Sequence, residues 1–86
     1  MPEISRFFGI VISMYHDDHL PPHFHVRCGS HRALVEIETL ALYRGALPPR
    51  IRRLVVEWAL QHRAELRDNW NRAQRGSPLA PIEPLE

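Results

Sequence analysis

The chain has 86 residues, which is long enough for one small domain with a thin core and too short for several domains. Hydrophobic residues make up 44% and charged residues 24%, with a formal net charge of +1, a composition typical of globular proteins and not of disordered ones. A single cysteine excludes an internal disulfide, no apolar run is long enough to span a bilayer and no secretion signal is recognised, so we expect a cytoplasmic protein without a membrane partner.

The N-terminal half has the residue pattern of β-strands. Residues 4–15 are rich in aromatic and β-branched side chains and predict one strand that is apolar on both faces. Residues 16–22 contain paired aspartates and paired prolines, which predict a loop because proline cannot continue a β-ladder. Residues 23–28 and 31–39 alternate in side-chain character and predict two further strands, and residues 42–44 predict a short fourth one.

The dipeptide Gly29-Ser30 fits a two-residue hairpin turn with glycine at the first central position. Such a turn places Phe24 opposite Val35 on an apolar face, and His23 opposite Glu36 on the other face. A slip of one residue would mix the two faces. The pattern therefore predicts the register of this hairpin.

Residues 49–75 carry apolar side chains at steps of three and four, which predicts a helix that follows Pro48 and ends before Gly76. At 1.5 Å per residue this helix would be about 40 Å long, whereas a domain of this size is roughly 30 Å across. We therefore expect the helix to overhang, bend or pack against another chain, as in a homodimer. No glycine or proline lies between residues 50 and 75, so a kink near His62 would require tertiary packing.

The final residues, 76–86, place a proline at every third position from Pro78 with apolar residues between, which predicts an extended tail docked on an apolar surface. The expected fold class is α+β: a three- to four-stranded antiparallel meander, one long or kinked C-terminal helix and an extended proline-rich tail. We expect a single domain over residues 1–86, with the meander in 1–45, the helical part in 48–75 and the tail in 76–86.

Five of the six histidines lie between residues 16 and 31. Histidines two residues apart on a strand point to the same side, so His23 and His25 could offer two imidazoles to one ion or one substrate. As a metal site, Asp18, His19, His23 and His25 would suit zinc or another first-row divalent cation.

The same segment could work without a metal. His23 and His25 would then act as general acid and base, Glu36 would orient an imidazole and Arg27 would bind a phosphate or carboxylate. A third alternative is structural, because a histidine opposite Glu36 can be an ordinary hydrogen-bonded pair. No nucleophile motif, glycine-rich phosphate loop or cysteine pair accompanies these residues.

All 11 basic residues are arginine, and seven of them lie in residues 48–75, which carry a net charge of +4. Arg50, Arg52 and Arg53 stand at the start of the predicted helix, where the helix dipole disfavours cations. Together with the free N–H groups of the first turn they predict an anion-binding site. The alternative is that arginine-rich codon usage and a solvated helix face account for the charges.

The stretch Asp18-His19-Leu20-Pro21-Pro22-His23-Phe24-His25-Val26 closely resembles the bacterial domain-of-unknown-function family DUF4160. The resemblance covers nearly the whole chain, from the opening Met-Pro-Glu-Ile-Ser-Arg-Phe-Phe-Gly-Ile through Leu47-Pro48-Pro49-Arg50, Trp58, His62-Arg63 and Asn69-Trp70 to Ile82-Glu83-Pro84-Leu85. It implies no established substrate, cofactor or catalytic residue. Because His16, Cys28 and His31 look peculiar to this chain, the resemblance favours a site built on Asp18, His19, His23 and His25.

Members of this family are often encoded beside another small domain, in a layout similar to toxin–antitoxin gene pairs. The resemblance thus implies a cytoplasmic component of a two-gene module that acts on or binds RNA, with the protein encoded by the neighbouring gene as its partner. The alternatives are a non-enzymatic protein- or nucleic-acid-binding module with a structural histidine cluster, and a His/Asp divalent-metal site. Whether the chain is an enzyme stays open on the residues alone.

Overall fold

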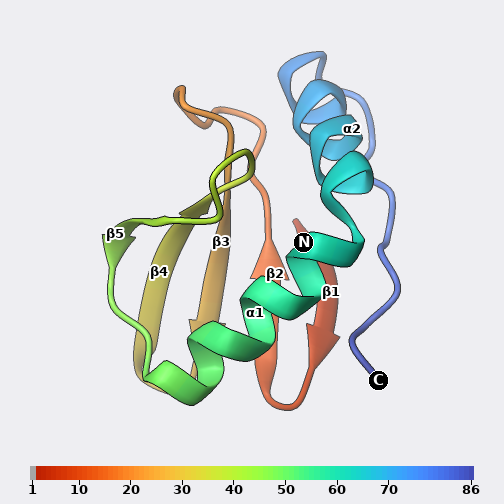
Figure 1. Cartoon of the computed structure of the whole chain (residues 1–86). Helices are drawn as coiled ribbons and strands as arrows, with labels where there is room; N and C mark the ends of the chain where they lie inside the picture. Colours follow the sequence, from red (N-terminus) through yellow and green to blue (C-terminus); the bar gives the residue numbers. More distant parts are fainter. Residues whose placement is uncertain (1) are drawn as a thin grey trace.

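The computed structural model describes residues 2–86 and shows a five-stranded antiparallel sheet followed by two helices (Figure 1). The α+β class is therefore confirmed. The sheet has five strands and not the expected three or four, and the helix that was expected to be long or kinked is two helices. The strands lie side by side in chain order, and the elements are β1 (Glu3–Phe7), β2 (Ile10–Ser13), β3 (His23–Cys28), β4 (His31–Glu36), β5 (Leu42–Gly45), α1 (Pro49–Gln61) and α2 (Arg63–Gln74).

The single strand expected over residues 4–15 is a hairpin. The chain turns at Phe8 and Gly9, whose φ angles of 50° and 77° are those of a two-residue type I′ turn, so that Phe7 pairs with Ile10. Gly9 is the sequence signal for this turn, because glycine adopts a positive φ without steric cost. The apolar character of both faces comes from two short strands that each contribute to the core.

The register predicted for the second hairpin is confirmed. Phe24 pairs with Val35 and His23 with Glu36, and Gly29 has a positive φ of 60° at the turn. The second of these strands is shorter than expected. It ends at Glu36, and Leu40, with a φ of 59°, turns the chain into β5.

The long helix is broken at His62, whose φ of −126° and ψ of 24° lie outside the helical range. Two contacts beyond the break tie α2 to the end of β4: Arg63 Nε donates to the Ile37 carbonyl at 3.1 Å, and the Arg67 guanidinium binds both carboxylate oxygens of Glu38. The longest dimension of the molecule is 33 Å, so the overhang that motivated a homodimer is absent from the described residues. No helix among residues 2–86 is long and apolar enough to cross a membrane.

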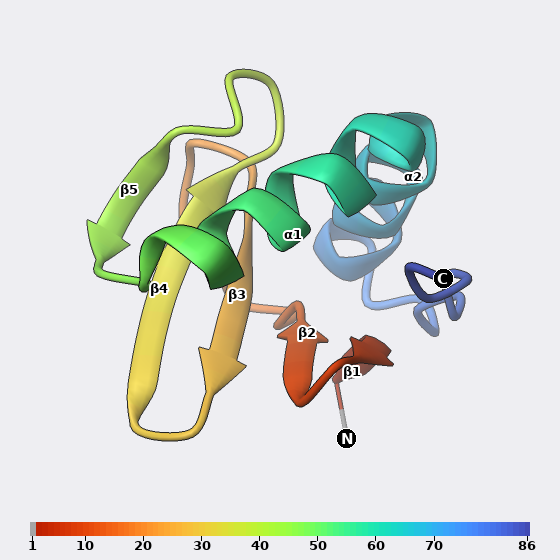
Figure 2. The ribbon, with the colours of Figure 1, turned by 60° about the horizontal axis from the view of Figure 1, so that its bottom comes forward.

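The core lies between α1 and one face of the sheet (Figure 2), and Trp58 of α1 is its largest fully buried side chain. The Trp58 ring is fully buried and contacts Phe7 and Phe24, with ring centroids 5.4 Å and 5.9 Å away. Since Phe24 faces α1, the strand alternation turns His25 and Arg27 to the opposite face of the sheet, which is uncovered at these two residues.

The C-terminal tail closes the side of this core, as expected from its apolar spacing. Ile82 and Leu85 are buried, and the Ile82 amide donates to the Ile4 carbonyl at 2.8 Å, beside strand β1. The Trp58 indole donates to the Glu83 carbonyl at 2.8 Å. The tail thereby covers the β1 edge of the sheet and connects it to α1.

Candidate functional site

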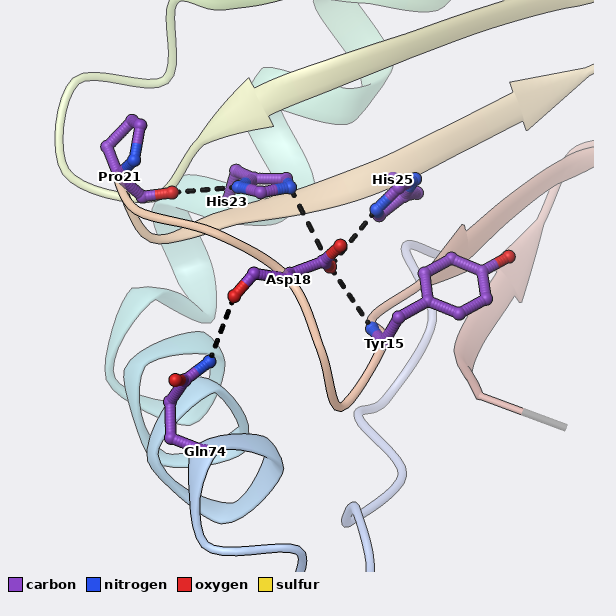
Figure 3. A network of polar contacts seen from close by, with 6 residues as sticks. All are labelled: Tyr15, Asp18, Pro21, His23, His25 and Gln74. Atoms are coloured by element: carbon purple, nitrogen blue, oxygen red, sulfur yellow. Dashed lines mark hydrogen bonds and ion pairs between the residues drawn. The ribbon is translucent and has the colours of Figure 1, made fainter.

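The loop between β2 and β3 brings Asp18 against two histidines of β3 (Figure 3). Asp18 Oδ2 lies 3.1 Å from His25 Nε2 and 3.6 Å from His23 Nε2. One ligand atom from each residue lies within 4.8 Å of the other two, which makes this a group able to hold a metal ion. We call these three residues the Asp–His cluster.

Backbone contacts set the position of Asp18 in the cluster. Its carboxylate accepts the Tyr15 amide at 3.3 Å, and its own carbonyl accepts the Gln74 side-chain amide at 3.4 Å from α2. The Tyr15 contact lies within the loop, and the Gln74 contact holds the loop to α2, as Figure 3 shows. The first contact joins residues three positions apart in the sequence, whereas the second joins residues 56 positions apart.

His23 has a defined tautomer. Its Nδ1 lies 2.7 Å from the Pro21 carbonyl, and because a carbonyl can only accept, Nδ1 must carry the hydrogen. In the neutral ring the lone pair is then on Nε2, which is directed at Asp18. The ring is only 4% exposed and packs near Trp70 and Tyr43, with centroids 5.5 Å and 5.8 Å away.

His25 is the accessible member of the cluster. Its side chain is 31% exposed, and its ring meets Tyr15 edge-on at a centroid distance of 4.5 Å. A solute on the uncovered face of the sheet would therefore reach His25 before His23.

The structure brings together Asp18, His23 and His25 from the sites predicted in the sequence, but not the others. Glu36 pairs with His23 in the ladder, yet among residues 2–86 the Pro21 carbonyl and not Glu36 accepts its ring hydrogen. His19 is exposed and is not part of the ligand group. Sequence reasoning did not identify Pro21 as the orienting acceptor, because no side-chain pattern marks a carbonyl group.

A pocket of about 390 Å³ opens on the uncovered face of the sheet beside His25. Tyr15 and His25 line it at one end, and Arg27, Arg32 and Arg44 supply its positive charge. We call it the sheet pocket. Arg27 was predicted to bind anions, whereas Arg32 and Arg44 were not singled out, although the predicted hairpin register already placed Arg32 opposite Arg27.

The charges of the sheet pocket are unbalanced. Arg27 and Arg32 are direct cross-strand partners, an arrangement in which like charges destabilise a sheet. Among the described residues, Glu3 is the one acid that lines the pocket, and the hydrogen bond from Arg6, with a smaller contribution from the charge of Arg27, holds the pKa of Glu3 below its ordinary value. None of Arg27, Arg32 and Arg44 forms an ion pair with any residue that the structure describes.

Arg50, Arg52 and Arg53 lie elsewhere. They are exposed in the first turns of α1, which begins at the end of the molecule opposite to the β2–β3 loop (Figure 1). Arg52 and Arg53 border a second hollow, which is lined mainly by apolar residues of α1 and the segment before it. These arginines do not contribute to the Asp–His cluster or to the sheet pocket.

Comparison with known proteins agrees with the resemblance carried by the Pro-Pro-His-Phe-His-Val segment. Residues 9–71 match the family described as a domain of unknown function, DUF4160, and this range includes the cluster, the sheet pocket arginines and both helices up to Asn71. No curated protein and no solved structure matches the chain significantly. The family match spans well over half of the 86 residues, and the chain therefore belongs to the DUF4160 family.

Proposed function

We propose that this protein binds RNA on the uncovered face of its sheet and acts on it at the Asp–His cluster. The observation that carries the proposal is the continuity of the two features: His25 belongs to the cluster and also lines the sheet pocket with three arginines free of ion pairs to described residues. One guanidinium group can donate two parallel hydrogen bonds to two oxygens of the same phosphate, so this face suits a phosphodiester backbone.

The residues beside the arginines favour RNA over a small anion. Tyr15 is partly exposed at the pocket edge, where its ring can stack on an unpaired base. RNA also supplies a 2′-hydroxyl as its own nucleophile, so a site with imidazoles and a carboxylate needs no serine or cysteine nucleophile. The 2′-oxygen would form a bond to phosphorus as the bond to the 5′-oxygen breaks. The Asp–His cluster would take the 2′-hydroxyl proton and return a proton to the leaving 5′-oxygen, with His25 as its accessible member.

In a two-gene module of the kind that the family resemblance implies, this activity would be that of a toxin in the cytoplasm, and the neighbouring small protein would neutralise it. Induced expression should then arrest bacterial growth and degrade RNA, co-expression of the neighbouring gene should restore growth, and His25→Ala should be harmless. Unimpaired growth with intact RNA would contradict the toxin role.

Binding is tested by the fluorescence anisotropy of a short labelled single-stranded RNA. The double variant Arg27→Glu/Arg32→Glu should lower affinity at least about tenfold and flatten its salt dependence, because two phosphate contacts are lost. The matched control, Arg50→Glu/Arg52→Glu, makes the same charge change at the start of α1 and should alter affinity by no more than about threefold. An equal loss in both variants would contradict the proposed RNA face and favour the anion site predicted at Arg50, Arg52 and Arg53.

Cleavage is tested separately from binding. His25→Ala should slow cleavage of the same RNA at least about 100-fold, the lower end of what proton transfer by a side chain contributes, with a much smaller effect on binding. Glu36→Gln should have little effect, because Pro21 and not Glu36 orients His23. RNA binding without cleavage by the native protein would instead support the non-enzymatic alternative, in which the histidine cluster is structural.

A further inference from the structure

We infer that Asp18, His23 and His25 bind one divalent first-row transition-metal ion, with one position of the ion left open towards the sheet pocket. The inference deepens the proposed function, since it concerns the same cluster, but metal binding can be measured without RNA. It also narrows the predicted ligand set, because His19 is outside the group.

The spacing of the ligand atoms fits a small tetrahedral ion. Ligands about 2.0–2.1 Å from zinc at tetrahedral angles are separated from each other by roughly 3.3–3.4 Å. Asp18 Oδ2 lies 3.1 Å from His25 Nε2 and 3.6 Å from His23 Nε2, on either side of that value. Bringing the two nitrogens into the same sphere requires only small rotations, because all three atoms already lie within 4.8 Å of one another.

The hydrogen bonding of His23 prepares it as a ligand. The Pro21 carbonyl takes the Nδ1 hydrogen at 2.7 Å, and a backbone carbonyl on the far nitrogen is the usual outer partner of a metal-binding histidine. Nε2 forms no hydrogen bond with residues 2–86, and its lone pair faces a carboxylate oxygen at 3.6 Å. Two electron-rich atoms in that position repel each other unless a proton or a cation lies between them. His25 Nε2 donates to the same carboxylate oxygen at 3.1 Å, so this nitrogen would give up its hydrogen when the ion binds.

The surroundings of the cluster distinguish a reactive site from a purely structural one. Structural zinc sites are closed by four protein ligands, whereas three protein ligands leave a position for water or substrate. Here the third ligand, His25, lines the sheet pocket, so the open position would face the phosphate held by Arg27 and Arg32. A cation there would supply positive charge beside the phosphate oxygens.

The donor atoms define which ions should bind. Two imidazole nitrogens and one carboxylate oxygen suit zinc, cobalt and related ions, whereas magnesium and calcium prefer oxygen ligands alone. We therefore expect zinc and cobalt to bind and a large excess of magnesium not to displace them.

The test uses the full chain, purified without a histidine tag and stripped of metal with a chelator. Zinc is titrated by calorimetry, and cobalt by its visible absorption, which reports the number and geometry of ligands. The native protein should bind one ion per chain. Asp18→Asn and His25→Ala should each weaken binding at least about tenfold, and both are chosen because replacing the buried His23 would also disturb the fold.

Matched controls use histidines outside the cluster. His31→Ala and His19→Ala remove exposed imidazoles and should change affinity by no more than about twofold. Equal weakening by these variants and by His25→Ala, or more than one ion per native chain, would show scattered binding to surface histidines and overturn the inference.

The failure of this inference and that of the proposed function are distinguishable. Arg27→Glu/Arg32→Glu should lower RNA affinity at least about tenfold while leaving the cobalt spectrum intact. Asp18→Asn, at a residue that does not line the sheet pocket, should weaken cobalt binding while leaving RNA affinity intact. One-to-one metal binding in a protein that does not bind RNA would reject the RNA proposal and retain the metal site. RNA cleavage that persists after chelation, in a protein that binds no cobalt, would reject the metal site and retain the RNA proposal.

Discussion

At the scale of single residues, Phe8 occupies a backbone conformation that its side chain disfavours. Its φ is 50° at the first position of the β1–β2 turn, and its side chain is 61% exposed, so little packing compensates for the strain. Asparagine tolerates this conformation, and Asn-Gly is the preferred sequence for a type I′ turn.

We expect Phe8→Asn to raise the free energy of unfolding by about 0.5–1 kcal/mol, measured by chemical denaturation. Phe8→Val is a control with the opposite expected effect, because a β-branched residue at positive φ should lower the free energy of unfolding. Destabilisation by Phe8→Asn would show that the edge-on contact of Phe8 with Phe7, at a centroid distance of 6.4 Å, outweighs the backbone strain.

Gly45 is the second position where the backbone restricts the side chain. It ends β5 with a φ of 82°, and a Cβ built there would lie 2.2 Å from the Arg32 carbonyl oxygen and 2.9 Å from the Ala33 Cα. Both contacts are with backbone atoms of the neighbouring strand, so neither can be relieved by rotating a side chain.

Gly45→Ala should therefore lower the unfolding free energy by roughly 3 kcal/mol, the sum of left-handed strain and the steric clash. Gly29→Ala is the matched control: it has the same sign of φ and open space around its Cβ, and should cost only about 1 kcal/mol. In a domain of this size the difference corresponds to a gap of about 8–16 °C in Tm. Equal melting temperatures would show that β5 shifts away from β4.

At the scale of elements, the break between the helices is matched by contacts to the turn after β4. Arg67 binds Glu38 through two hydrogen bonds of 2.6 Å and 2.7 Å, and Arg63 donates to the carbonyl of Ile37. A continuous helix would carry these arginines past the end of the sheet. The break at His62 redirects α2 so that both arginines reach the turn after β4.

The hydrogen bonds from Arg67 hold the pKa of Glu38 below its ordinary value. Because the folded-state pKa is lowered, the contribution of Glu38 to stability is present above its unfolded pKa and is lost as the pH falls through the folded value. We expect Arg67→Gln to return the Glu38 pKa towards 4.5 in an NMR titration of the side-chain carbonyl. Arg72→Gln, which breaks a pair within α2, should leave Glu38 unchanged, and a Glu38 pKa insensitive to Arg67 would contradict the bidentate pair.

At the scale of the whole molecule, the tail completes a core that the sheet and helices leave open. Ile82 is 4% exposed, and its backbone is bonded to β1. The buried Asn69 of α2 binds the Ala80 backbone in both directions, at 2.8 Å and 2.7 Å. The tail is thus a packed layer that joins the two ends of the chain.

Ile82→Ala should lower the unfolding free energy by about 2–4 kcal/mol, as expected for a cavity in a core, and should do so in a single cooperative transition. The control Glu83→Ala removes an exposed side chain next to it and should cost less than about 0.5 kcal/mol. Thermal unfolding followed by circular dichroism measures the stability of both variants. An Ile82→Ala variant as stable as the native protein would contradict the docked tail.

Features that depend on neighbours in the chain could be predicted. The Gly29-Ser30 turn with the alternation around it gave the correct register of β3 and β4, and the apolar spacing of the tail indicated its docking. The β1–β2 hairpin was missed because the apolar run around Phe8-Gly9 obscured a turn whose first residue is atypical. Of the site, the pair His23 and His25 followed from the two-residue period of a strand.

Side-chain periodicity and turn chemistry were therefore enough to predict the α+β class, the central hairpin and the two histidines on one strand face. The tertiary structure alone decided the break at His62, the approach of Asp18 and the Pro21 carbonyl to the histidines, and the joining of Arg44 to Arg27 and Arg32. Each of these depends on where a loop or a helix end meets a distant segment. Such contacts are set by the packing of the whole chain around Trp58, which no short-range pattern encodes.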